Sequence, residues 1–393
     1  MMLKFILTIF LLPICITHAI AEPYIPNSPA QVLETIPTNA SIASKEFKKL
    51  RALLNAEPNN TTLAAQLART FIERSRIEGD PRYLGYAQAV LAPWWKMSDP
   101  PIEVIVLRAT LLQSTHHFDQ SLADLDKVLK LDPNNGQAWV TRATILQVQG
   151  KYVEAYASCE HLYKLTSRLI TLTCATNIRN LSGQAASSYQ KLKNVYAESN
   201  ETNPTIQVWV LTLLAEMAVR LGDDVAADQY FQQAMKVEDP DSYLLGAYSD
   251  FLLDQKRSQE VIKLLKTKTK IDALLLRYAE ALLASNSAEV GLQIETLKQR
   301  FAAALLRNDT VHQREYSRFE LRLMHNPIKA LQIAKQNWEV QKEPADARVY
   351  LEAAIAAKDS AAMQTMMQWL VTKKLEDVTL NKIVKNYKSA STL

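Results

Sequence analysis

Apolar and small side chains recur at helical spacing between Gly136 and Ser167. Over residues 137–148 they fall on one face of a helix. Gly150 is suited to take the backbone out of that helix, and the same spacing resumes over 152–165. The pattern therefore predicts two antiparallel helices. Such a hairpin cannot bury its outer face alone, so it needs neighbours of the same build.

Related hairpins occur on both sides of this one. Residues 111–135 repeat the pattern of its second helix, and residues 213–240 repeat the pattern of a whole unit. The glycines at 150, 183 and 222 are 33 and 39 residues apart. Weaker copies extend the pattern over about residues 45 to 375, which predicts an array of helix pairs.

The unit resembles the tetratricopeptide repeat (TPR), a helix-turn-helix of about 34 residues. The residues at the signature positions of that family are Trp139, Ala143, Gly150, Tyr152, Ala155 and Cys159. Cys159 departs from the usual aromatic residue, and Ser167 departs from the usual proline. The resemblance implies an all-α solenoid of antiparallel helix pairs, wound as a right-handed superhelix over residues 42–375.

The two ends of the chain differ from this array. Lys4, an apolar run over 5–16 and the small residues at 19 and 21 indicate a signal peptide over residues 1–21. Residues 22–41 are rich in proline and predict a flexible leader, and 376–393 are expected to be a tail. We therefore expect a periplasmic or secreted protein of the exported bacterial type, without stable membrane insertion after cleavage.

Composition narrows the class of protein. Only 8 glycines and 15 prolines occur among 393 residues, which favours helix. The net charge of +4 is too small to indicate nucleic acid as a partner. Residues 223–254 carry a charge of −7 and residues 255–270 a charge of +5. This reversal near 254–255 could mark a docking surface or the solvated faces of successive helices.

Candidate chemistry is sparse. The glycine spacing excludes the phosphate-binding loops G-x-G-x-x-G and G-x-x-x-x-G-K-[ST]. His312, Arg314 and Glu315 could form a metal or acid–base site, so an envelope hydrolase or metal-dependent enzyme is the alternative function. The same residues could equally be side-chain partners near a helix start. With no third ligand or nucleophile in view, we expect no enzyme, no metal and no cofactor.

Two cysteines, Cys159 and Cys174, remain after signal cleavage. Each is seven or eight residues from the break between two helices at 166–167, so they stand at the same height in an antiparallel hairpin. They could form a disulfide or remain as two core thiols.

The family resemblance also implies a binding surface, because the first helix of each TPR hairpin lines the concave side. The side chains at those positions are mostly uncharged hydrogen-bonding groups: Thr110, Gln113, Gln137, Thr144, Gln147, Thr173, Asn177, Asn180, Trp209, Thr212 and Glu216. Asn, Gln and Thr can pair with the backbone of an extended peptide. The expected function is a scaffold that binds a peptide or helical surface of a client in the cell envelope, for assembly or a chaperone-like task.

Overall fold

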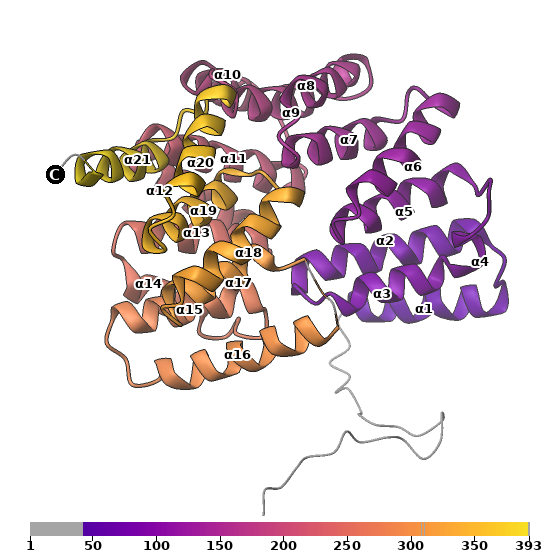
Figure 1. Cartoon of the computed structure of the whole chain (residues 1–393). Coiled ribbons are helices and arrows are strands. Elements are labelled where there is room, and N and C mark those ends of the chain that lie inside the picture. The colour runs from indigo at the N-terminus through magenta and orange to yellow at the C-terminus, as the bar shows by residue number, and fades with distance from the viewer. Residues whose placement is uncertain (1–41, 308, 310, 392–393) are drawn as a thin grey trace, which may run out of the picture. The chain divides into compact units, whose positions relative to one another are not determined.

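The computed structural model describes residues 42–391, except for 308 and 310. The expected signal at 1–21 and leader at 22–41 lie outside the described residues. The chain separates into two compact units, Met1–Glu46 and Phe47–Leu393. Helix α1 (Ile42–Ala56) crosses this boundary, and the other helices lie in the second unit (Figure 1).

All regular elements of the described residues are helices. After α1, their bounds are α2 Thr61–Glu78, α3 Arg82–Val90, α4 Ala92–Trp95, α5 Ile102–Ser114, α6 Phe118–Leu131, α7 Gly136–Val148, α8 Tyr152–Glu160, a 3-10 turn His161–Lys164, α9 Arg168–Asn180, α10 Ala185–Ala197, α11 Pro204–Leu221, α12 Asp224–Val237, α13 Ser242–Asp254, α14 Ser258–Leu265, α15 Asp272–Ala284, α16 Val290–Leu306, α17 Gln313–Arg322, α18 Pro327–Val340, α19 Pro344–Ala356, α20 Ser360–Lys373 and α21 Val378–Ser391.

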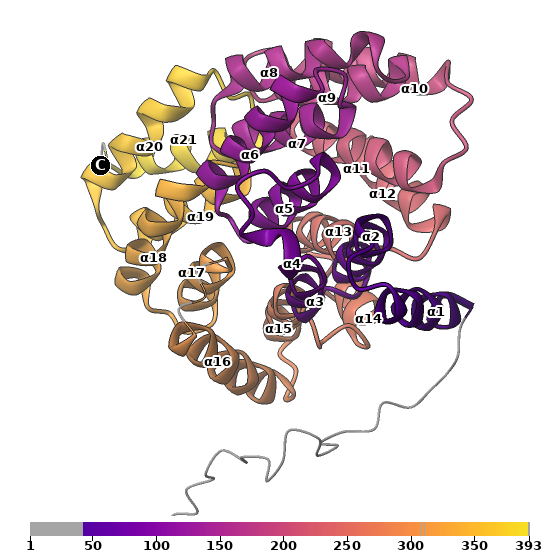
Figure 2. The ribbon, with the colours of Figure 1, turned by 90° about the vertical axis from the view of Figure 1, so that its right-hand side faces the viewer.

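Consecutive helices from α5 to α20 pack as antiparallel pairs, so the chain is an all-α, TPR-like solenoid. We call α5, α7, α9, α11, α13, α15, α17 and α19 the first helices, and their partners from α6 to α20 the second helices. Within residues 47–393, the second helices α8, α10, α12, α16, α18 and α20 lie outside the first helices (Figure 2). The fold class predicted from the sequence is confirmed.

Local sequence explains where the helices begin and end. Asn135 caps α7 by accepting a hydrogen bond from the Ala138 backbone N–H at 3.0 Å. Gly150 has a φ of 70°, the left-handed conformation that lets the chain reverse into α8. The second helix predicted over 152–165 is α8 to Glu160, followed by the 3-10 turn.

Small residues at the crossings let the paired helices approach closely. Ala143 is 1% exposed and Ala155 is fully buried, whereas Cys159 and Leu162 fill the space beside them.

Helix α11 is apolar and long enough to cross a membrane by length and composition alone. In this fold it packs against α10, α12 and α13, as a core helix does.

The C-terminal helices pack against the turns of earlier hairpins. The Lys342 backbone N–H donates to the Val148 carbonyl at 2.7 Å, and Lys373 Nζ donates to the Gly150 carbonyl at 2.8 Å. Glu376 accepts a hydrogen bond from the Ala185 backbone N–H at 2.6 Å. Helix α21, within the segment that we expected to be a tail, contacts α11 and α19. Residues far apart in sequence therefore share one core.

Candidate functional site

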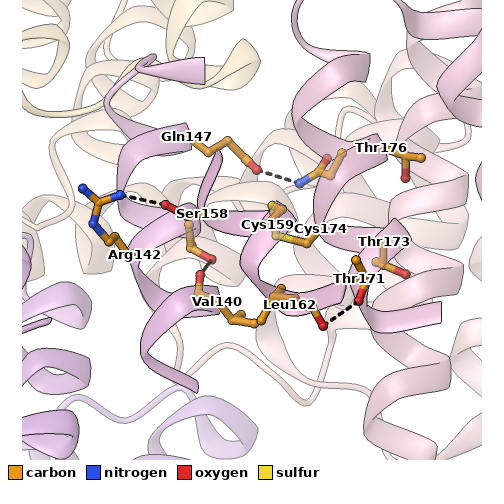
Figure 3. Close-up of a disulfide and its surroundings, with 12 residues drawn as sticks. Val140, Arg142, Gln147, Ser158, Cys159, Leu162, Thr171, Thr173, Cys174 and Thr176 are labelled. Atoms are coloured by element: carbon orange, nitrogen blue, oxygen red, sulfur yellow. Dashed lines mark hydrogen bonds between the residues drawn. A yellow bond between two sulfur atoms is a disulfide. The ribbon is translucent and has the colours of Figure 1, made fainter. Parts of the chain in front are cut away.

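The expected inner wall is built by the first helices. Hydrogen bonds between side chains join neighbouring first helices along it. Asn177 on α9 donates to Gln147 on α7 at 2.9 Å, as Figure 3 shows beside the labelled Gln147. The Tyr243 hydroxyl on α13 donates to Glu216 on α11 at 2.8 Å. These bonds place side chains of successive units next to each other, as the repeat register implies.

Eight of the eleven wall residues keep some exposure. Gln137 and Thr144 are exposed, and the half-buried members are Thr110, Gln113, Gln147, Asn177, Trp209 and Glu216. The Thr110 and Thr144 hydroxyls donate to the carbonyls of Val106 and Val140 in their own helices, both at 3.0 Å. Their oxygen lone pairs therefore remain to accept a hydrogen bond.

Thr173, Asn180 and Thr212 are buried, so these three members of the expected wall are not accessible to a client in this structure. The hydroxyls of Thr173 and Thr212 donate to carbonyls within their own helices. Asn180 donates to the Ala185 carbonyl at 3.2 Å and accepts from Arg220 Nε at 2.6 Å. The N-terminus of α10 and a side chain from α11 thus cover Asn180.

Glu216 is the charged residue among the eleven wall residues. Burial raises the pKa of the Glu216 carboxyl, and the positive charge of Arg220 opposes this rise. Tyr243 beside it is 58% exposed, yet the surrounding protein and the charge of Glu216 raise the pKa of its hydroxyl well above the ordinary value. Around these two residues the wall is polar, and the neighbouring carboxylates disfavour further negative charge.

The sequence did not point to the next feature, an ion network that crosses α13, α15, α17 and α19. In it four arginines and four carboxylates alternate, in the order Arg277, Asp250, Arg318, Glu280, Arg322, Glu352, Arg348 and Asp254. The N–O distances between successive members of this chain are 2.6, 2.6, 2.6, 3.2, 2.7, 2.8 and 2.6 Å. Burial alone would raise the pKa of Asp250, but Arg277 and Arg318 hold it well below its usual range. Asp250 and Asp254 belong to the acidic segment 223–254, so part of that charge is neutralised inside the protein.

The residues of the alternative enzyme site form a second charged cluster. Arg314 lies 3.4 Å from Glu315, 3.0 Å from Glu343 and 3.5 Å from Asp346. Burial would raise the pKa of Glu315, but the charge of Arg314 lowers it to about 2. Among the described residues His312 forms no ion pair with Glu315, and no three metal-binding side chains meet. The contacts of Arg314 are those of charge compensation.

Cys159 on α8 and Cys174 on α9 form a disulfide with a Cα–Cα distance of 5.7 Å (Figure 3). The bond closes a sequence separation of 15 residues across the hairpin junction. Disulfides persist in oxidising compartments, so the bond is a weak indication of such a location.

No family model matches the chain, and no curated protein matches it. Among solved structures, it is similar to the human IFIT1 dimer with PPP-AAAA, at 15% identity and a TM-score of 0.37, over 90% of this chain and 82% of that chain. The P58(IPK) TPR domain aligns at 16% identity and 0.21, over 89% and 98%. Yeast Tom70 aligns at 10% identity and 0.20, over 88% and 96%. Because these TM-scores are low, the function has to be argued from the geometry of this chain.

Proposed function

We propose that this chain is a non-enzymatic scaffold that holds an extended segment of a client protein against the exposed part of its inner wall. One observation carries the proposal. Four successive first helices, α5, α7, α9 and α11, each present at least one exposed or half-buried polar side chain on this wall. A peptide backbone has unpaired N–H and C=O groups, and amide and hydroxyl side chains can pair with both.

The Cys159–Cys174 disulfide supports an exported location, as does the signal predicted over residues 1–21. We place the scaffold in the periplasm or outside the cell, where it would assemble or protect other exported proteins. The fold is of a type that is typically non-catalytic, and the charge compensation around Arg314 supports a structural task for that cluster.

The first experiment identifies the client. A photo-crosslinking amino acid at Thr144, which is exposed on α7, should trap a protein from envelope extract. The same group at Val153, which is 82% exposed on the second helix α8, is the matched control. Crosslinks from both positions in equal yield would argue against binding on the inner wall.

The second experiment measures the contribution of the wall. Gln147→Ala with Asn177→Ala removes both partners of one hydrogen bond, so neither is left unpaired inside the protein. At about 0.5–1.5 kcal/mol for each lost contact to the client, affinity should fall roughly 5- to 150-fold. Gln190→Ala with Asn194→Ala removes an equivalent pair, 2.7 Å apart on α10, and should leave affinity unchanged.

An enzyme that uses His312, Arg314 and Glu315 would give the opposite result. It would tolerate the wall substitutions and lose activity on replacement of His312. Unchanged client affinity in the folded Gln147/Asn177 double variant would contradict the proposal.

A further inference from the structure

Two consecutive hairpins carry an arginine at the same position of the repeat. Helices α7 and α8 begin 34 residues after α5 and α6, so Arg142 corresponds to Arg108. Each arginine extends toward the second helix of its own hairpin and bonds to a residue 16 positions later. The repeat therefore provides an internal comparison of one arginine in two settings.

Arg108 is fully partnered inside the protein. Its Nε and Nη2 donate to the two carboxylate oxygens of Asp124, both at 2.7 Å, and its Nη1 donates to the Trp95 carbonyl at 2.6 Å. The side chains of Arg108 and Asp124 are only 11% and 8% exposed. This two-point geometry is the strongest that an arginine and a carboxylate can form.

The corresponding position in the next hairpin holds Ser158 in place of an aspartate. Arg142 Nη1 donates to the Ser158 hydroxyl at 2.7 Å, which Figure 3 shows, and the hydroxyl donates onward to the Glu154 carbonyl. The only carboxylate near Arg142 among the described residues is that of Asp126, which is 55% exposed and 3.3 Å from Nε. Nη2 donates to no atom of the described residues. Among the described residues, no carboxylate therefore binds the Arg142 guanidinium at two points, as Asp124 binds that of Arg108.

A cavity of about 380 Å³ lies at this position, between α6 and α8. Arg142 and Ser158 lie on its wall together with the exposed side chains of Lys130 and His161. Trp139 stacks on His161 with ring centroids 3.8 Å apart and an angle of 7° between the planes. The cavity therefore combines two fixed positive charges with a flat aromatic surface, against the single negative charge of Asp126.

We propose that this cavity binds an acidic side chain of a partner protein, and that the partner's carboxylate pairs with Nε and Nη2 of Arg142, as Asp124 does on Arg108, and displaces the exposed Asp126 from Nε. Planar two-point recognition of carboxylates is the chemistry for which arginine is best suited. Lys130 would add a second positive charge, and the stacked rings would contact the apolar part of the acidic residue. The cavity is lined by α6, α7, α8 and the 3-10 turn, and none of the eleven wall residues lines it. It is therefore independent of the function proposed for the inner wall.

Octaglutamate serves as the probe, with octaglutamine as the uncharged peptide of equal length. Calorimetric titration of the oxidised protein at low salt should detect octaglutamate and not octaglutamine. Arg142→Gln should weaken octaglutamate binding at least about tenfold, because it removes the charged donor. Arg168→Gln is the matched control, since Arg168 is an exposed arginine paired with Glu198 at 2.8 Å, and it should bind as the wild type does.

A third variant uses the internal comparison directly. Ser158→Asp introduces the carboxylate that the preceding hairpin already contains, so it should occupy Arg142 and weaken octaglutamate binding as strongly as Arg142→Gln. Circular dichroism checks that each variant remains helical.

The proposal is overturned if octaglutamate does not bind, or if Arg142→Gln and Ser158→Asp both bind it as the wild type does. Tighter binding of a single-stranded oligothymidylate than of octaglutamate would assign the cavity to phosphate and would likewise overturn it.

Discussion

Asn180 is a polar residue that is buried where partners from other parts of the chain reach it. Asn180 is fully buried on α9, and its side chain both donates to the Ala185 carbonyl and accepts from Arg220. Arg220 is 9% exposed, so it depends on that acceptor. Asn177, one turn earlier, is half-buried and bonds only to Gln147, which has access to water.

Asn180→Ala should therefore lower the free energy of unfolding by about 1–3 kcal/mol, because it leaves the buried guanidinium without its acceptor. Asn177→Ala is the matched control and should cost less than about 1 kcal/mol. Urea unfolding followed by circular dichroism measures both. Equal losses in the two variants would show that Arg220 does not depend on Asn180.

His116 is a residue whose protonation depends on its surroundings in the folded protein. It lies in the turn between α5 and α6 with a φ of 59°, and its Nδ1 is 3.1 Å from Gln341 Nε2. Burial, followed by the charges of Arg314 and His312, lowers the pKa of its ring to about 4, against the opposing charges of Glu315 and Asp309. The neutral ring can accept the hydrogen bond from Gln341.

This lowered pKa predicts a loss of stability in acid. Below pH 6.5 the unfolded chain binds a proton at His116, but the folded protein does not until the pH falls to about 4. His116→Asn, which suits the left-handed backbone, should remove the part of the pH dependence that lies between these values. His117→Asn changes the exposed neighbour and should follow the wild type. Urea midpoints across this range would contradict the assignment if His116→Asn and wild type stayed parallel.

The wall residues show which properties of a single side chain can be predicted from the sequence. Periodicity assigns a residue to a face of its helix, because that depends only on its neighbours in sequence. Whether the face is covered depends on groups from elsewhere, such as the Arg220 side chain that reaches Asn180 from 40 residues away. The burial of Thr173 and Asn180 on α9 and of Thr212 on α11 could therefore not be predicted from periodicity alone.

At the scale of elements, the hairpins could be predicted because their signals are local. Glycine after the first helix, small residues at the crossing and apolar spacing lie within one unit of about 34 residues. Helix α21 carried no such signal, because its apolar positions pack on α11 and α19 and not on a hairpin partner. The disulfide joins α8 to α9, and its two cysteines stand at equal distances from the break in the chain.

Removing this disulfide should destabilise the hairpins that it joins. Cys159→Ala with Cys174→Ala should lower the free energy of unfolding by about 3 kcal/mol, the loop-closure value for a separation near 15 residues. A reducing agent should shift the urea midpoint of the wild type in the same direction and leave the double variant unaffected. Two free thiols in the unfolded, unreduced protein would contradict the presence of the bond.

At the scale of the whole array within residues 47–393, long-range ion pairs connect helices that are not neighbours in sequence. Arg348 on α19 bonds to both carboxylate oxygens of Asp254 on α13, 94 residues earlier. The sequence shows Arg314, Arg318 and Arg322 at intervals of four, which places them on one face of a helix. It does not show most of the carboxylates that they meet, because all of these except Glu315 lie on, or next to, the helices α13, α15 and α19.

Arg318 is the member of this network on which the array should depend most. It bonds to Asp250 and Glu280 at 2.6 Å each, and its side chain is 10% exposed. Arg318→Met leaves Asp250 and the buried Glu280 with one fewer positive charge, which should cost about 3–5 kcal/mol of unfolding free energy.

Arg300→Met is the matched control for this substitution. Arg300 pairs with Asp272 at 2.7 Å, but its side chain is 35% exposed, so water screens the pair and the loss should be below about 1 kcal/mol. Urea midpoints of the two variants, with native-state hydrogen exchange of α13 to α19, make the comparison. If Arg318→Met costs no more than Arg300→Met, the network does not hold these helices together, and their packing has to come from the apolar core alone.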